Sequence, residues 1–239
     1  MTPTRTLQTL TIISIVAFAV GLVMMLAYAG TDVFQGEVQR LFYFHLASFT
    51  GAFLAFVVGM IGGVAYLMTR AAKWDRLSLS AVEVGFVLAL INVCLGSIWA
   101  RPTWNTWWTA QDPRMVSSAI MMLVCGAYLT LRQSIENRER RRTFAAALAI
   151  ILLSTALATA LITRFRGDTI HPVVIGSSPQ NVSAGVEMAS TMTLTLVVNL
   201  VAWTFLLTPT LIIWRLRLEN LREEVASFQS PVARQNTGR

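Results

Sequence analysis

Six apolar segments, each long enough to cross a lipid bilayer, constrain this 239-residue chain more than any other feature. A bilayer core requires about 20 predominantly apolar residues in a helix. The chain is 55% hydrophobic and 13% charged, whereas a soluble domain averages about 25% charged residues. We therefore predict an all-α, polytopic membrane protein that forms one integral membrane domain over residues 1–239. The six predicted transmembrane helices are Thr9–Ala29, His45–Met68, Ser80–Trp99, Met115–Leu131, Phe144–Ile162 and Ala189–Trp214.

The first segment ends in Ala27-Tyr28-Ala29, which has the small-residue pattern of a signal-peptidase site. Its apolar run is longer than the roughly 7–15 residues of a signal-peptide core. We therefore expect a retained helix. Cleavage, the alternative, would not alter the orientation of the other five helices.

The positions of the basic residues predict how the helices are oriented. Of the 19 Lys and Arg residues, 14 fall on one side of the predicted membrane and five on the other. Because basic residues gather on the cytoplasmic side, we expect both termini and the tail over residues 215–239 to be cytoplasmic. The net charge of +7 then reflects topology and does not indicate nucleic-acid binding. Three loops should face outward: Gly30–Phe44, Ala100–Arg114 and Thr163–Met188.

The rarity of lysine excludes one class of activity. Lys73 is the single lysine and is not part of a Gly-Lys-Ser/Thr sequence, so the chain has no Walker A motif. If the function uses ATP, another subunit binds the nucleotide. Cys94 and Cys125 lie in apolar segments without the spacing of a redox pair or a zinc site, and we expect both to be packing residues.

Three polar residues fall inside the apolar segments. Asn92 and Asn199 lie in the middle of predicted helices, where amides usually form hydrogen bonds between helices. Glu83 lies near the inner end of the third helix, where a buried carboxylate is costly. We expect it to reach the membrane surface or to pair with Arg76 or Arg70. The mixed-charge segment after the sixth apolar run could continue that helix beyond the membrane.

The most unusual stretch is RPTWNTWWTAQDPR, from Arg101 to Arg114, between the third and fourth apolar segments. Its tryptophans are Trp104, Trp107 and Trp108. If the stretch is helical, their i, i+3, i+4 spacing puts all three indoles on one face, with Pro102 in the first turn and Pro113 ending or kinking the helix. Indoles flanked by arginines suit a large, flat, anionic aromatic ligand. The alternative is an aromatic belt, because Trp gathers at membrane interfaces in many proteins.

Both histidines of the chain, His45 and His171, fall on the predicted outer side. Neutral imidazole is a good axial ligand of haem iron, and iron in a porphyrin has two axial positions. We call the three indoles of Trp104, Trp107 and Trp108 the tryptophan shelf. Two histidines beside this shelf therefore indicate a bis-histidine haem site. The alternative is that each is an interfacial polar residue. A zinc site is a weaker alternative, because the outer acidic residues show no HExxH-type spacing. These acidic residues are Asp32, Glu37, Asp112, Asp168 and Glu187.

The order of residues from Gly96 to Ser118, GSIWARPTWNTWWTAQDPRMVSS, resembles the tryptophan-rich "WWD" signature of haem-handling proteins. Within that group the chain is most similar to the haem exporter protein C (CcmC) family of cytochrome c maturation. The segments FYFH at 42–45 and DTIH at 168–171 resemble the two histidine segments of that family. The residues that match the signature in order are Trp99, Pro102, Trp104, Trp107, Trp108, Asp112 and Arg114.

The chain also departs from the family pattern. Asn105 replaces a glycine, and Thr109-Ala110-Gln111 makes the signature one residue longer and one tryptophan short. Leu46-Ala47-Ser48 follows His45 without the usual proline, and the tryptophans before the second histidine are missing. These differences affect the expected geometry of the shelf and the position of Asp112, but both histidines remain.

The resemblance implies that haem b binds at the outer face, with His45 and His171 as its axial ligands. The tryptophans would support the macrocycle, while Arg101 and Arg114 would pair with the anionic propionates. Asp112 would cap or orient the loop rather than contact iron. The predicted haem site thus comprises His45, His171, Trp104, Trp107, Trp108, Asp112, Arg101 and Arg114.

The resemblance also implies partners. Family members hand haem to the membrane-anchored chaperone CcmE and work beside the ATP-binding subunit CcmA, the membrane subunit CcmB and the one-helix subunit CcmD. A separate ATP-binding subunit agrees with the missing Walker A motif. The chain is then a multi-pass subunit of the bacterial inner membrane, or of an equivalent organelle membrane, that binds and transfers haem and is not an enzyme.

Three other functions fit parts of the pattern. A CcsA-type haem–cytochrome c synthase component also carries the signature, but such proteins typically have more helices and more histidines. A haem b electron-transfer subunit commonly carries its histidine ligands inside the helices, whereas neither histidine here is in the middle of a predicted helix. A transporter permease whose aromatic loop is only a belt would bind no haem.

Overall fold

The computed structural model describes residues 3–166, 168–171 and 188–228, and the regular secondary structure in these residues is helical. Six of its helical segments are long and apolar enough to cross a membrane, which confirms the all-α, six-span prediction. The elements in chain order are α1 (Arg5–Val23), η1 (Met24–Tyr28), η2 (Glu37–Arg40), α2 (Leu41–Thr69), α3 (Ala72–Trp104), α4 (Pro113–Ser134), α5 (Arg138–Phe165), α6 (Ser190–Val201), η3 (Ala202–Leu207) and α7 (Thr208–Phe228).

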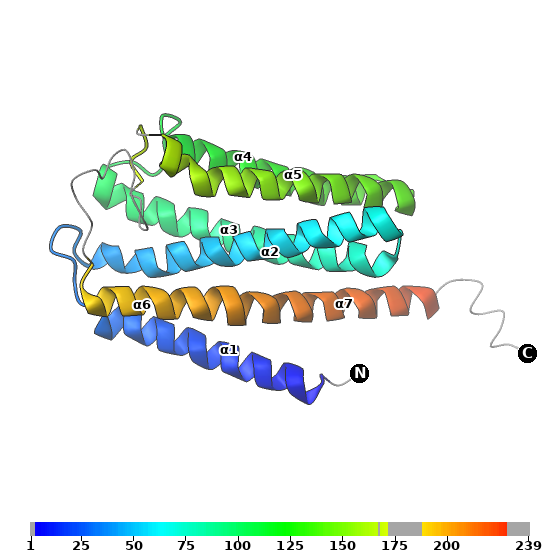
Figure 1. Cartoon of the computed structure of the whole chain (residues 1–239), viewed down its shortest axis with the longest axis horizontal. Helices are drawn as coiled ribbons and strands as arrows, with labels where there is room; N and C mark the ends of the chain where they lie inside the picture. The colour runs from blue at the N-terminus through cyan, green and yellow to red at the C-terminus, as the bar shows by residue number, and fades with distance from the viewer. Residues whose placement is uncertain (1–2, 167, 172–187, 229–239) are drawn as a thin grey trace, which may run out of the picture.

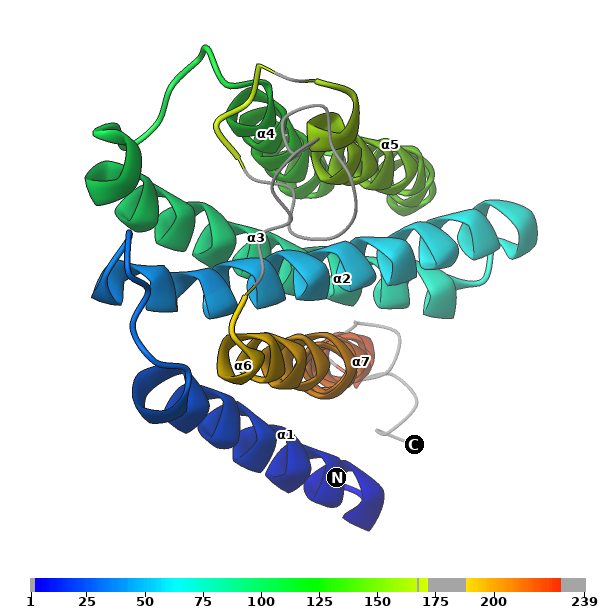
Figure 2. The ribbon, with the colours of Figure 1, turned by 60° about the vertical axis from the view of Figure 1, so that its left-hand side comes forward.

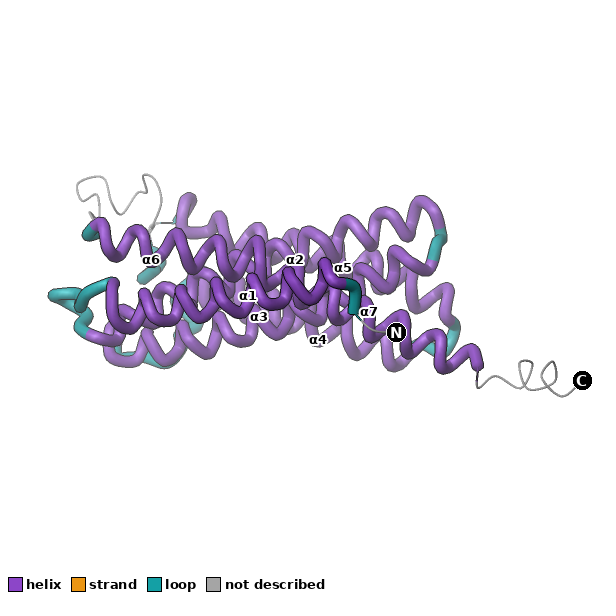
Figure 3. Tube along the Cα trace, turned by 90° about the horizontal axis from the view of Figure 1, so that it is seen from below, coloured by secondary structure: helices purple, strands orange, loops and turns teal. Residues whose placement is uncertain are grey.

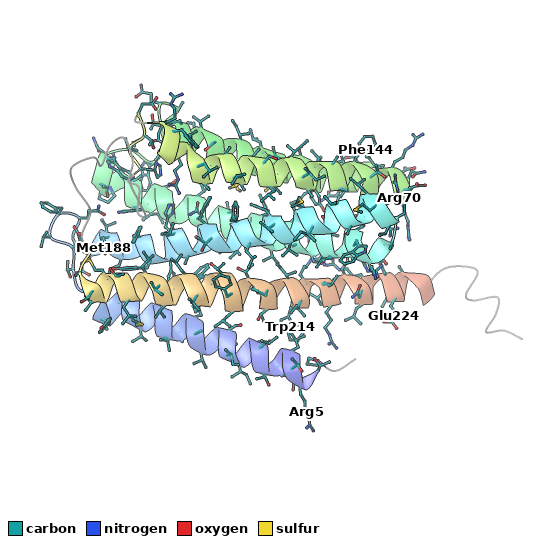
Figure 4. All side chains as sticks on the ribbon, viewed as in Figure 1. Arg5, Arg70, Phe144, Met188, Trp214 and Glu224 are labelled. Atoms are coloured by element: carbon teal, nitrogen blue, oxygen red, sulfur yellow. The ribbon has the colours of Figure 1, made fainter. Side chains whose placement is uncertain are left out.

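The helices form three layers (Figures 1 and 2). The hairpin of α2 and α3 is the middle layer, with α4 and α5 on one side and α1 with α6–α7 on the other. The loops gather at the two ends of the bundle (Figure 3). We call the end where α2 begins and α3 ends the aromatic end. The opposite end, the terminal end, carries Arg70, Phe144 and Glu224, far from Met188 (Figure 4).

The helices are longer than the apolar segments that predicted them. The third runs from Ala72 to Trp104, and α6, η3 and α7 continue one another from Ser190 to Phe228. Hydropathy marks only the part of a helix that lies in hydrocarbon, whereas the backbone pattern continues through charged residues at both ends. The expected continuation of the sixth helix is confirmed.

Small residues allow the middle layer to pack closely. A Cβ atom added at Gly62 on α2 would lie 2.9 Å from the backbone nitrogen of Ser78 and 2.9 Å from the backbone oxygen of Trp74, both on α3. Helices in membranes associate through such close backbone approach, because lipid supplies no hydrophobic drive between them. Gly62 therefore allows the backbones of α2 and α3 to approach each other closely at this point.

Gly62→Ala is expected to destabilise the protein by about 1–3 kcal/mol, the usual cost of overpacking a tight interface. The neighbouring atoms belong to backbone and cannot turn aside. Gly126→Ala on α4 is the matched control, because an added Cβ there meets nothing within 4 Å. Thermal unfolding of the purified proteins in detergent measures both changes, and equal stability of the two variants would contradict the prediction.

Polar side chains inside the bundle have interhelical partners. Asn199 Nδ2 donates to the carbonyl of Gly21 at 3.2 Å, which joins α6 to α1 as predicted. The predicted partners of Glu83 are wrong, because it pairs with Arg215 on α7. Arg76 is engaged instead by Glu223, at 2.7 Å. Both ion pairs join α3 to α7, two helices that are far apart in the sequence. The spacing of charged residues along the chain could therefore not predict which residues pair.

The two cysteines differ in their surroundings. Cys125 is buried in the core, as expected, but Cys94 is exposed. A membrane helix has a lipid-facing side, so a cysteine in an apolar segment can point outward without cost.

Candidate functional site

The predicted site residues meet at the aromatic end. A small cavity there lies between α2, α3, the loop over residues 105–112, α4, α5 and the segment over residues 168–171. His45, His171, Trp107, Trp108 and Arg114 all line it. Residues from four separate parts of the sequence therefore converge on one place.

His45 is held by α3. Its Nδ1 lies 2.9 Å from the backbone oxygen of Asn92, and the Asn92 side chain donates to the His45 carbonyl at 2.7 Å. Gly96, one turn further along α3, makes room for the ring, since a Cβ there would lie 2.7 Å from His45 Cε1. With Nδ1 facing the carbonyl of Asn92, Nε2 is the nitrogen left for a ligand.

Asp112 connects the start of α4 with the segment that carries His171. Its Oδ1 accepts hydrogen bonds from the backbone N–H groups of Arg114 at 3.0 Å and Met115 at 2.9 Å, the geometry of a helix N-cap. Its Oδ2 accepts from the Thr169 hydroxyl at 2.7 Å and from the Ile170 N–H at 2.8 Å. Asp112 was expected to cap or orient the loop, and the structure shows it as the N-cap of α4.

The carboxylate of Asp112 also faces His171. His171 Nδ1 lies 3.2 Å from Asp112 Oδ1, and Asp112 is 2% exposed. Burial raises the pKa of the Asp112 carboxyl, but contacts with His171, Thr169 and the Met115 N–H outweigh it and hold that pKa well below its usual range. Asp112 is therefore ionised at neutral pH, and its carboxylate lies beside Nδ1 of His171, which leaves Nε2 as the ring nitrogen that a ligand could meet.

A chain of aromatic rings connects the two histidines. The His45 ring lies 5.8 Å from Trp99, Trp99 lies 5.8 Å from Trp104, and Trp104 lies 5.7 Å from His171, measured between ring centroids. Trp99 is buried, and its Nε1 donates to Gln35 at 2.8 Å. Trp99 and Trp104 thus connect the two histidines, but neither of these two tryptophans lines the cavity itself.

The condition under which the three indoles would share one helical face, a helix through all three tryptophans, is not met. Helix α3 ends at Trp104, because Asn105 adopts a left-handed conformation with φ of 54°. Pro102 thus lies in the last turn of α3, and Pro113 opens α4 immediately after its N-cap. Trp107 and Trp108 lie in the loop between the two helices and are 58% and 47% exposed.

The two arginines of the predicted site differ. Arg114 lines the cavity, and its guanidinium lies 5.6 Å from the ring centroid of Phe49. Arg101 is exposed, lies outside the cavity lining and donates to the carbonyl of Asn105 at 2.9 Å. Arg114 is therefore placed to meet an anionic ligand in the cavity, while Arg101 is occupied at the end of α3.

The cavity itself is small, about 40 Å³, which is room for about one water molecule. A porphyrin cannot lie between the histidines at this volume. Trp107 and Trp108, which line the cavity, are also exposed at the surface of the protein.

The zinc alternative finds no support in the described part of the chain. Among those residues, no group of three His, Cys, Asp or Glu side chains is placed to hold a metal ion. Glu187, one of the acidic residues considered above, lies outside them.

A family model described as heme exporter protein C matches residues 2–230. This chain belongs to that family. Heme exporter protein C of Paracoccus denitrificans is 26% identical over 205 residues, which cover 86% of this chain and 81% of that protein. The Escherichia coli K12 protein of the same name is 27% identical over 59% of this chain and 58% of its own length. Cytochrome c biogenesis protein CcsA of Synechococcus is 33% identical, over 36% of this chain and 26% of that protein.

Three residues at the site were not assigned to it from the sequence. Asn92 was expected to bridge helices, but not to His45. Gly96 follows Asn92 by four positions, a spacing that places both on one face of α3. Thr169 lies two residues before His171, and only the folded chain brings its hydroxyl to Asp112.

Proposed function

We propose that this protein holds haem at the aromatic end, with His45 and His171 as the axial ligands of its iron. One observation carries the proposal: both histidines line a single cavity and both turn Nδ1 toward an oxygen of the protein. A ligating histidine almost always engages its other ring nitrogen in this way. The family membership supports a role in haem handling for cytochrome c biogenesis.

The chemistry of the surrounding side chains fits haem as a cargo. The rings of Trp99 and Trp104 offer flat aromatic surface next to the two histidines, and Arg114, which lines the cavity, offers a cation for a propionate. The carboxylate of Asp112 lies behind His171, with Oδ1 3.2 Å from Nδ1 of that imidazole. Arg101 is the weaker of the two predicted propionate partners, because Asn105 already engages it.

We propose further that the exposed Trp107 and Trp108 are the side from which haem b enters and leaves. Cargo held at a surface loop can be passed to a second protein without crossing the bundle. The receiving protein in this proposal is the haem chaperone CcmE, with CcmA, CcmB and CcmD as the other subunits. The proposed role is transport in the bacterial inner membrane, or an equivalent organelle membrane, without a catalytic step.

The aromatic end is proposed to face outward and the terminal end the cytoplasm, because 14 of 19 basic residues fall on the terminal side. A reporter fused after Thr106 should then be active only outside the cytoplasm. A reporter fused after Glu136, in the turn between α4 and α5, should give the opposite signal. Reversed signals would contradict the orientation and, with it, delivery to an outer partner.

The double substitution Trp107→Ala and Trp108→Ala should lower haem affinity by about tenfold at unchanged protein level. Each indole contact contributes about 0.5–1.5 kcal/mol beyond its buried area. Trp74→Ala is the control, since this half-buried tryptophan lies at the terminal end, and it should leave haem affinity unchanged. Titration of the purified protein with haem, followed by visible absorption, measures both. If the double variant and the Trp74→Ala control bind haem with equal affinity, Trp107 and Trp108 do not contact haem and belong to an aromatic belt at the membrane interface.

A further inference from the structure

Gln35 lies in the loop between η1 and η2 at the aromatic end, far in the sequence from the tryptophan that it contacts. Its side-chain oxygen accepts a hydrogen bond from Nε1 of Trp99 at 2.8 Å, a contact between residues 64 positions apart. Gln35 is not among the residues that line the cavity. An influence of Gln35 on bound haem must therefore pass through Trp99.

Trp99 is the ring that connects the two halves of the haem site. Its centroid lies 5.8 Å from that of His45, and the two planes meet at 66°, an edge-on arrangement. Its centroid also lies 5.8 Å from that of Trp104, which in turn lies 5.7 Å from His171. The orientation of this one indole thus bears on the placement of both histidines.

The plane of the His45 ring depends on more than its hydrogen bond. Nδ1 of His45 lies 2.9 Å from the backbone oxygen of Asn92, and the ring can still tilt about that contact. Aromatic pairs favour edge-on over face-to-face packing, so Trp99 restricts the tilt. Groups that hold a ligating imidazole in place typically change affinity by about 10–100-fold. A ring that fixes the plane of His45 is therefore expected to affect the binding of iron.

The indole of Trp99 needs a hydrogen-bond acceptor where it lies. Trp99 is 5% exposed and belongs to a cluster with Phe42 and Leu196, whose side chains offer no oxygen. A buried N–H group without a partner is costly, so the indole is held with its Nε1 edge toward Gln35. Loss of this acceptor would allow the ring to turn its N–H toward a different one.

The backbone that carries Gln35 is held by a tight turn. Asp32 Oδ1 accepts from the N–H groups of Phe34 at 2.8 Å and Gln35 at 2.7 Å, and Asp32→Asn would keep this turn. The Gly36 N–H donates to the Asp32 carbonyl at 3.0 Å. Gly36 has a φ of 61°, a conformation that glycine adopts without steric cost. The amide of Gln35 is therefore presented to Trp99 from a fixed position.

We propose that Gln35 is a positioning residue of the haem site. It fixes the orientation of the Trp99 indole, and that indole fixes the plane in which His45 meets the iron. The inference rests on the proposed function and adds to it a residue from a loop that contributes nothing to the cavity lining.

Haem titration and electron paramagnetic resonance of the purified variants test the proposal. Gln35→Leu removes the acceptor and should lower haem affinity by about 5- to 10-fold, less than the loss of a direct support of the ligand. It should also shift the g values of low-spin ferric haem, because these report the angle between the two axial imidazole planes. Gln35→Glu keeps an acceptor oxygen and should bind haem within about twofold of the wild type.

Gln39→Leu is the matched control. This buried glutamine lies in η2 at the same end, and its Oε1 has no hydrogen-bond partner among the described residues. The variant should keep the haem affinity and the g values of the wild type. Equal losses in Gln35→Leu and Gln39→Leu would show a general weakening of this region and overturn the proposal. Wild-type affinity and g values in Gln35→Leu would overturn it as well.

A double-mutant cycle shows whether the effect passes through Trp99. Trp99→Phe keeps an aromatic ring but has no N–H, so Gln35→Leu in that background should change haem affinity by less than about twofold. An undiminished effect there would contradict the proposed route. All these comparisons use a wild-type protein with a bis-histidine spectrum. If the wild type lacks that spectrum, the proposed function itself fails, and the role of Gln35 fails with it.

Discussion

Alanine or glycine at His45 or at His171 is expected to abolish the six-coordinate, low-spin absorption spectrum of bound haem and to lower haem retention by at least about tenfold. Substituting groups that merely support a ligating histidine already costs about 10–100-fold in affinity. The loss of the ligand itself should cost no less. The double variant should retain the least haem.

Added imidazole is the control that separates ligation from a structural role. A small imidazole can occupy the axial position that each single variant leaves empty, so it should restore much of the low-spin spectrum. The glycine variants leave the most room for it. An interfacial histidine would respond differently, since its loss would change protein level or thermal stability and imidazole would restore nothing.

The two single variants are also compared with each other. If the His171 variant keeps a wild-type spectrum while the His45 variant does not, the site has one histidine ligand and the other axial position belongs to a different group. Gly96→Ala should resemble the His45 variants in part, because its Cβ displaces the His45 ring. Imidazole should restore the spectrum in that variant as well.

The sequence predicted the membrane fold because its main constraint is local. A run of apolar residues long enough to cross the bilayer can satisfy its backbone only as a helix, so hydropathy alone locates all six spans. Antiparallel connection of successive spans then puts His45 and the segment of His171 at one end. Several predicted segments are shorter than the helices that contain them. The helices continue through charged residues that lie beyond the apolar segments, and hydropathy does not detect this part.

The backbone conformation at the site depends on residues that end or start a helix, and these residues outweigh the helical spacing of the tryptophans. The spacing of Trp104, Trp107 and Trp108 fits a helix, but Asn105 in a left-handed conformation ends α3 first. The sequence Asp112-Pro113 is a strong helix start, and it requires a loop before it. The residues that end α3 and start α4 thus make residues 105–112 a loop, although the spacing of the tryptophans fits a helix.

Asp112→Asn is expected to weaken haem binding by about 10–100-fold while leaving most of the protein's stability. Asparagine is as good an N-cap as aspartate when its amide oxygen faces the N–H groups of Arg114 and Met115, and in that orientation α4 keeps its start. Its NH₂ group, however, replaces one of two acceptor oxygens. Whichever way the amide turns, the NH₂ faces backbone N–H groups, either of Arg114 and Met115 or of Ile170. The negative charge beside His171 is also lost.

Asp112→Ala should lose both functions of the side chain. Removing the cap costs about 0.5–2 kcal/mol, and the buried Thr169 hydroxyl and the Ile170 N–H lose their acceptor at about 1–3 kcal/mol more. Haem titration and thermal unfolding of the purified variants measure the two effects separately. Asp32→Asn is the matched control, because this aspartate accepts from two backbone N–H groups at the same end and contacts neither histidine. Wild-type haem affinity in Asp112→Asn, with reduced stability in Asp112→Ala, would reduce Asp112 to a helix cap and remove its part in orienting His171.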